Sequence, residues 1–354
     1  MSNPAMPFQP DYRHILSVMK NERPRRLPIY EHIFSSKVME KVLSAEFAPL
    51  EDGDAREQAE FFRQYCRFFK EMTYDTVSYE VCITDILPGH GAIMGGRPGP
   101  IQTRQDFERY PWKELPALFW KKGAGRFDAV SASLPDGMKA VGGVGNGLFE
   151  ISEDLVGFEY LSYLQVDDPA LFGDLYRRIG DLMVELWTEF LRRYSAAYAI
   201  CRFGDDLGFK TGLLLKPATF TEHVLPQYRR VIGLIRGQEK PFLWHSCGNI
   251  FEIMEQVIAL GINAKHSNED TIAPFDRWIR QYNDRIGLLG GIDVDVLCQK
   301  SPDEVFQRVL EMGLRFRREA RGYALGSGNS IPDYVPAENY LAMVRAAQEI
   351  RARE

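Results

Sequence analysis

The chain has 354 residues, of which 45% are hydrophobic and 26% charged, and its formal net charge is −6. This composition is typical of a globular protein, and the lack of a basic block disfavours nucleic acid as a partner. No apolar run approaches the ~20 residues that span a membrane, and the first residues lack the pattern of a secretory signal. The five cysteines are an odd number and thinly spread, which favours a reducing cytoplasm over a disulfide framework.

Eight short β-rich runs follow one another along the chain, and an amphipathic helical stretch follows most of them. The runs cover residues 26–33, 76–83, 138–145, 197–204, 241–248, 262–269, 286–293 and 322–329. Alternation of strand and helix predicts a parallel sheet, because parallel neighbours need a crossover. Eight such units favour a closed α/β fold, the (β/α)8 or TIM barrel. An open doubly wound sheet is the alternative, although no glycine-rich phosphate loop follows the first run.

We therefore predict a single barrel domain over residues 1–354, with an N-terminal helical extension and an insertion, 104–136, before the third strand. The helices carry start and end signals. Ser301 begins one of them with a proline next and a glutamate at the third position, the capping-box pattern. Asn249 is expected to cap another helix, and 169–194 is the longest periodic stretch.

Polar residues gather where the predicted strands end, which is where barrel enzymes carry their chemistry. They are Glu31, His32, Glu80, Asp85, Asp205, Asp206, His245, Cys247, His266, Glu269, Asp293, Ser327 and Asn329. The C-terminal face of any barrel is polar, so this list alone does not indicate a function. The more specific residue patterns within it do.

The most specific pattern is His245-Ser246-Cys247 at the end of the fifth run. Side chains at positions i and i+2 of an extended strand point to the same side. An imidazole and a thiolate would therefore project together, and both are good zinc ligands. Glu269 and His266, at the end of the next run, are candidates for a third ligand. A histidine and a cysteine in a barrel core, without metal, remain the alternative.

Two further patterns contain carboxylates. Asp205 and Asp206 stand between glycines at the end of the fourth run, so one can face the cavity while its neighbour caps the following loop. A plain aspartate-rich turn is the alternative. Asp85 and His90 lie in a glycine-rich loop after the second run, which is either a loop that closes over a ligand or a simple turn.

From about residue 12 to the C-terminus the chain resembles the uroporphyrinogen-decarboxylase superfamily, and within it the zinc-dependent methylcobamide methyltransferases. The motifs that carry the resemblance are FGDDLG (203–208), WHSCGNI (244–250), LGGIDV (289–294) and GSGNSIPDYVPAENYLAMV (326–344). The resemblance implies a barrel in which His245 and Cys247 bind zinc, and a methyl group delivered as methylcobamide by a corrinoid protein. Related cobalamin-independent methionine synthases add a glutamate ligand at the place of Glu269. The superfamily also favours a homodimer.

The chain departs from the family patterns at two places. The decarboxylases hold their substrate's carboxylates with an arginine-rich motif after the first strand, whereas residues 27–43 contain no arginine. The methyltransferases add a last cysteine ligand near the end of strand eight, whereas Asn329 stands nearest to that place here. One thiolate fewer makes the site less soft, so we expect weaker zinc binding and an acceptor that need not be a thiol.

Three hypotheses follow. The first is a zinc-dependent methyltransferase that moves a methyl group from a corrinoid protein to a thiol or another small acceptor. Asp205, Asp206 and Glu80 would then orient the acceptor or manage its proton. The second is a decarboxylase of a tetrapyrrole, in which Asp85 stabilises a protonated pyrrole as the family resemblance implies. The third is a non-catalytic barrel that binds a corrinoid or another ligand.

Overall fold

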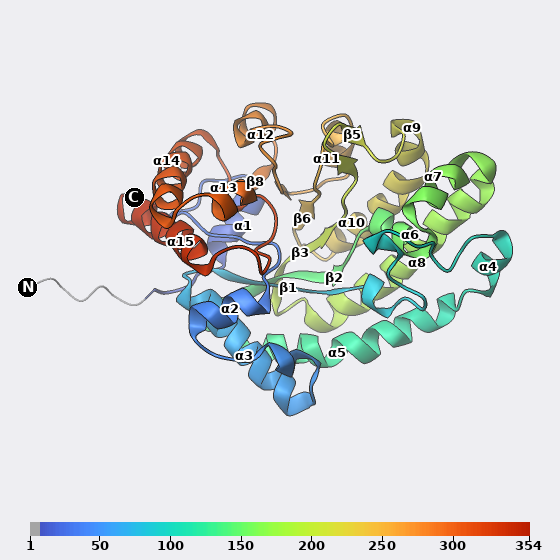
Figure 1. Ribbon diagram of the computed structural model, residues 1–354, viewed down its shortest axis with the longest axis horizontal. Coiled ribbons are helices and arrows are strands. Elements are labelled where there is room, and N and C mark those ends of the chain that lie inside the picture. Colours follow the sequence, from blue (N-terminus) through green and yellow to red (C-terminus); the bar gives the residue numbers. More distant parts are fainter. Residues whose placement is uncertain (1–7) are drawn as a thin grey trace, which may run out of the picture.

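The computed structural model describes residues 8–354, and its centre is a curled parallel sheet of seven strands (Figure 1). In sheet order these are β1 (Thr76–Cys82), β2 (Lys139–Gly145), β3 (Tyr198–Gly204), β6 (Phe242–His245), β7 (Ala264–His266), β8 (Gly287–Ile292) and β9 (Tyr323–Ser327). A two-stranded antiparallel hairpin, β4 (Gly208–Phe209) with β5 (Gly212–Leu213), follows β3. The prediction of an α/β fold of the TIM-barrel type is confirmed.

The prediction of a regular first strand over residues 26–33 is wrong. This segment makes a single parallel bridge, from Ile29 to Leu325 of β9, and a second one follows directly after it, from Phe34 to Ile331. Pro28 lies within it and has no N–H to donate to a sheet ladder. The segment therefore completes the ring beside β9 as extended chain rather than as a strand.

Buried side chains link this segment to the other side of the ring. Arg202 of β3 donates from Nη1 to the hydroxyl of Tyr30 at 2.8 Å and to the carbonyl of His32 at 2.7 Å. Its Nη2 lies 2.6 Å from Oε2 of Glu80 on β1, and the side chains of this ion pair are 0% and 6% exposed. Ser78 of β1 donates from Oγ to the carbonyl of Glu31. Hydrogen bonds from side chains of β1 and β3 thus hold the first segment in place of a regular backbone ladder.

Helices surround the sheet, with α14 and α15 on one side and α8 and α10 on another (Figure 1). They are α1 (Arg13–Met19), α2 (Ser36–Leu43), α3 (Ala55–Glu71), α4 (Arg104–Arg109), α5 (Leu115–Ser133), α6 (Leu148–Val156), α7 (Phe158–Asp167), α8 (Pro169–Tyr194), α9 (Pro217–Thr219), α10 (Leu225–Gly237), α11 (Met254–Ala259), α12 (Phe275–Tyr282), α13 (Val294–Gln299), α14 (Pro302–Glu319) and α15 (Ala337–Ala352). Short 3-10 turns lie at η1 (Ala48–Asp52), η2 (Thr84–Ile86), η3 (Ala92–Met94) and η4 (Trp112–Glu114), and a π turn at η5 (Phe220–Val224). Between residues 8 and 354, no helix is long and apolar enough to cross a membrane.

α1 precedes the first segment, as expected. α4 and α5 occupy the stretch 104–136, but α5 packs on α3 and is the crossover helix between the neighbouring strands β1 and β2, so it belongs to the regular barrel. α14 begins with the expected capping box of Ser301 and Glu304. The prediction that Asn249 caps a helix is wrong, because α11 begins only at Met254 and has Ile253 at its N-cap. The backbone N–H of Asn249 instead donates to the carbonyl of Phe209 at 2.8 Å.

The interior of the barrel is apolar at one end and polar at the other. An inner cluster joins α1 to the strands through Ile15, Val18, Met19, Tyr30, Val141, Ala199, Ile200, Leu243, Ala264, Leu289 and Ala324. α1 plugs the N-terminal end, since the Val18 carbonyl lies against Gly287 and Gly322 at the starts of β8 and β9. The buried polar side chains of His245, His266 and Ser327 lie at the C-terminal ends of β6, β7 and β9, and that end therefore carries the candidate site.

Candidate metal centre

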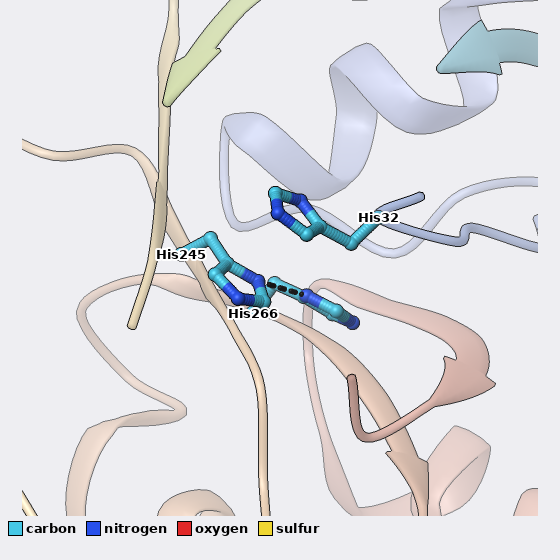
Figure 2. Close-up of side chains that lie close together, drawn as sticks. All are labelled: His32, His245 and His266. Carbon is cyan, nitrogen blue, oxygen red and sulfur yellow. Dashed lines mark hydrogen bonds between the residues drawn. The ribbon is translucent and has the colours of Figure 1, made fainter. Parts of the chain in front are cut away.

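The site is built at the ends of two neighbouring strands. His245 ends β6 and His266 ends β7, and the two residues are register partners in the parallel ladder. Cys247 follows His245 by two residues, as the sequence pattern predicted. Figure 2 shows the imidazoles of His32, His245 and His266 gathered in the barrel, with His245 and His266 joined by a hydrogen bond. All three histidines are buried.

The first group that can hold a metal ion contains Asp206, His245 and Cys247, whose ligand atoms all lie within 4.8 Å of one another. Nε2 of His245 is 3.6 Å from Sγ of Cys247, and Oδ1 of Asp206 accepts the backbone N–H of Cys247 at 2.8 Å. Imidazole, thiolate and carboxylate are all zinc ligands, and three protein ligands leave a coordination position open. The chemistry of this donor set fits zinc.

Glu269 belongs to neither group of potential ligands in this conformation. Asp206 follows β3, the strand on the other side of β6, and comes close to His245 and Cys247 instead. Glu269 lines a cleft of about 370 Å³ that also contains Asn329. The other residues of this cleft are Lys210, Asn268, Thr271, Asp293, Val294, Asp295, Cys298, Ser330, Pro332 and Tyr334.

The sulfur of Cys247 receives two hydrogen bonds. Asn329 donates from Nδ2 at 3.2 Å and Ser267 from Oγ at 3.4 Å. Burial and the neighbouring Asp206 raise the pKa of the Cys247 thiol well above its ordinary value. The thiol therefore keeps its proton at neutral pH until a cation replaces it, and the two donors then stabilise the thiolate.

The second group contains His32, His245 and His266, again with ligand atoms within 4.8 Å. The rings of His32 and His245 are stacked, with centroids 3.6 Å apart and planes at 6° to each other. An imidazole binds metal through a lone pair that lies in the ring plane. Two parallel stacked rings cannot direct such lone pairs at one ion, so these histidines do not form a common ligand set in this arrangement.

The two adjacent aspartates face different ways. Asp205 is buried and accepts the backbone N–H groups of Phe149 and Glu150, at 3.0 and 2.9 Å, at the start of α6. These N–H groups favour the carboxylate form, but burial outweighs them and raises the pKa of Asp205 to about 8. Asp205 thus anchors α6, while Asp206 faces Cys247.

Glu80 and Asp85 do not join the metal group. Glu80 is held in the buried ion pair with Arg202. Asp85 is half-exposed and pairs with Lys122 of α5 at 3.0 Å. Both carboxylates already have a cationic partner.

The sequence analysis missed two charged residues that lie near the site. Arg202 is a lone charge in an apolar strand, and a charge at a buried position could have signalled it. Glu150 lies beside the two aspartates, and its Oε1 accepts the N–H of Asp206 at 3.3 Å. Burial and the charges of Asp205 and Asp206 raise the pKa of Glu150 well above its ordinary value. The sequence signal for Glu150 was a charged residue within the largely apolar helical stretch 148–156.

The comparisons with known proteins agree with this architecture. Residues 100–350 match the family described as Uroporphyrinogen decarboxylase (URO-D). No curated protein matches the chain. A methyltransferase from Methanosarcina mazei shares the fold with a TM-score of 0.70 at 16% identity, over 96% of this chain and 99% of that one. A D-psicose 3-epimerase solved with D-fructose reaches a TM-score of only 0.41 at 11% identity, over 92% and 98% of the two chains.

Proposed function

Because the chain belongs to the uroporphyrinogen decarboxylase (URO-D) family, we propose that it is a zinc-dependent methyltransferase within that family. The observation that carries the proposal is the convergence of Asp206, His245 and Cys247 at the C-terminal end of the barrel. His245 would ligate through Nε2, Cys247 through Sγ and Asp206 through a carboxylate oxygen. The solved protein of this fold that is named a methyltransferase is consistent with the proposal, although its likeness is one of fold alone.

A bound zinc ion would supply Lewis-acid activation of the acceptor at the open coordination position. The chain's own residues prepare that position. Asn329 and Ser267 hold the sulfur of Cys247 by hydrogen bonds, and Asp206 fixes the backbone of the same residue. With one thiolate in place of two, the ligand set is harder than that of the methyltransferases the chain resembles, so the acceptor is a thiol or another small nucleophile.

The cleft beside Asn329 is where the acceptor would lie. An acceptor that gains a methyl group must lose a proton, and Glu269 lines this cleft as a base for it. The methyl donor would be methylcobamide on a corrinoid protein that docks at the open end of the barrel.

The test follows demethylation of free methylcobalamin by its absorbance, with zinc present and with small thiols or amines as acceptors. We expect transfer by the wild type and its loss in Cys247→Ala. Cys66→Ala, which removes a core thiol of α3, is the matched control and should keep the activity. Equal activity in Cys247→Ala and the wild type would contradict the proposal.

The decarboxylase hypothesis receives no support from a specific contact. A substrate with many carboxylates needs cationic partners. Lys210 is the one cationic side chain that lines the cleft within the described part of the chain, and three carboxylates, Glu269, Asp293 and Asp295, line it as well. Arg202 is neutralised by Glu80. Release of carbon dioxide from uroporphyrinogen, without methyl transfer, would restore this alternative.

A further inference from the structure

Two hydrogen bonds run in series behind the proposed ligand His245. Nε2 of His266 lies 3.0 Å from the carbonyl oxygen of Ser327, and Nδ1 of His266 lies 2.8 Å from Nδ1 of His245. A carbonyl oxygen only accepts, so Nε2 of His266 must carry the hydrogen. Both imidazoles are buried, and His266 bonds to His245 and to a backbone carbonyl rather than to a carboxylate. A second proton would leave a buried charge without a counter-charge, so each ring is neutral and carries one N–H.

The direction of the series follows from these facts. Since the one hydrogen of His266 is on Nε2, its Nδ1 presents a lone pair and must accept from Nδ1 of His245. The one hydrogen of His245 is then on Nδ1. Its Nε2 is left with a free lone pair, and this is the atom 3.6 Å from Sγ of Cys247.

We propose that His266 is a positioning residue that locks His245 in the Nδ1–H tautomer and so keeps Nε2 free for a metal ion. An unconstrained neutral histidine favours the opposite tautomer, with the hydrogen on Nε2. A histidine ligand whose other nitrogen is held by a fixed acceptor binds metal more tightly. The role of this tautomer in metal binding rests on the proposed function. The assignment of the tautomer of His245 does not.

The acceptor at the far end of the series is itself fixed. The backbone N–H of Ser327 donates to Oε1 of Glu31 at 2.9 Å, and its Oγ donates to Oε2 of the same carboxylate. Glu31 is buried at the end of the extended first segment. This arrangement gives a role to a buried carboxylate that the proposed methyl transfer does not use: it orients the Ser327 carbonyl toward His266.

His32 contributes in a different way. Its ring covers one face of His245 at 3.6 Å, and its Nδ1 is buried without a hydrogen-bond partner. It therefore restrains rotation of His245 through its ring face and not through a hydrogen bond. This difference makes His32 the natural control for His266.

The experiment is nitrogen-15 NMR of the full chain labelled at its six histidines and stripped of metal by a chelator. In the wild type we expect His245 to carry its hydrogen on Nδ1. In His266→Phe, which cannot accept, the hydrogen should move to Nε2. His266→Gln keeps an amide oxygen to accept and an amide N–H to donate to Ser327, so it should retain the wild-type tautomer, and so should His32→Phe.

Zinc affinity is the second readout. We expect His266→Phe to bind zinc roughly 10- to 100-fold more weakly, with most of the loss restored in His266→Gln. An Nε2–H tautomer of His245 in the wild type would overturn the proposal even if His266→Phe failed to fold. Equal affinity of His266→Phe and the wild type would overturn it as well. An Nδ1–H tautomer in a protein that takes up no zinc would instead refute the proposed function and leave the tautomer lock standing.

Discussion

We expect Cys247 to set how the zinc affinity of the proposed site depends on pH. Burial and Asp206 raise the pKa of its thiol, whereas burial lowers the pKa of His245. In the neutral range the metal-free site thus holds one proton to be displaced, on sulfur. We predict that apparent zinc affinity rises with pH, about tenfold per unit for one released proton, in competition titrations between about pH 6 and 8.

Cys247→Ser replaces the thiol with a hydroxyl, which is far less acidic and is not deprotonated in this pH range, so the variant should show a flatter pH dependence and weaker zinc binding. A wild-type affinity that does not change with pH would show that the thiol is not the group that zinc displaces. The same titration therefore separates a thiolate ligand from a bystander cysteine.

The sequence was also informative about single residues that lie close together in the chain. His245 and Cys247 lie two positions apart, and the period of an extended chain alone places them together. The third partner was harder to predict, because β6 has a neighbour on each side in the sheet. Glu269 follows one neighbour and Asp206 follows the other, and the chain order does not tell which carboxylate turns inward.

The loop that carries Cys247 is held by the hairpin of β4 and β5. Gly248 has a φ of +77°, and a Cβ there would lie 1.9 Å from the carbonyl oxygen of Gly208. We predict that Gly248→Ala displaces this loop, weakens zinc binding at least tenfold and destabilises the fold by about 1–2 kcal/mol from the left-handed backbone alone. Zinc titration and urea denaturation measure the two effects.

Gly237→Ala is the matched control, because a Cβ at this last position of α10 meets no atom within 4 Å. It should leave zinc binding unchanged and add at most ~1 kcal/mol of stability, since alanine favours a helix more than glycine does. Unaltered zinc binding in Gly248→Ala would mean that the close contact between Gly248 and Gly208 is not needed to position Cys247.

Elements with strong local signals were predicted well. α8 spans the periodic stretch 169–194 from end to end, and α14 begins at its capping box. The errors concern segments whose structure is determined by contacts with residues far away in the sequence. Residues 26–33 read as a strand but form no ladder, and Asn249 pairs with the β4–β5 hairpin instead of capping a helix. Neither partner could be inferred from the local sequence.

At the scale of the whole molecule, the ring is closed by Arg202 and not by a complete ladder. Removing one partner of a buried ion pair leaves the other charge unpaired and costs about 3–5 kcal/mol. We predict a loss of that size in the free energy of unfolding of Arg202→Met, measured by urea denaturation. The double variant Arg202→Met/Glu80→Met should recover most of the loss, because neither charge then remains buried.

Arg67→Met supplies the comparison, since its pair with Glu71 is exposed and such pairs contribute about 0–1 kcal/mol. A loss as small in Arg202→Met as in Arg67→Met would mean that the backbone bridges beside β9 close the barrel without help.

The central claim is that this barrel binds zinc through residues at its C-terminal end, and elemental mass spectrometry of the purified protein tests it most directly. We predict close to one zinc ion per chain in the wild type and none in the double variant His245→Ala/Cys247→Ala. A wild type that carries no zinc and takes up none on titration would contradict the account and favour a metal-free decarboxylase or ligand-binding barrel.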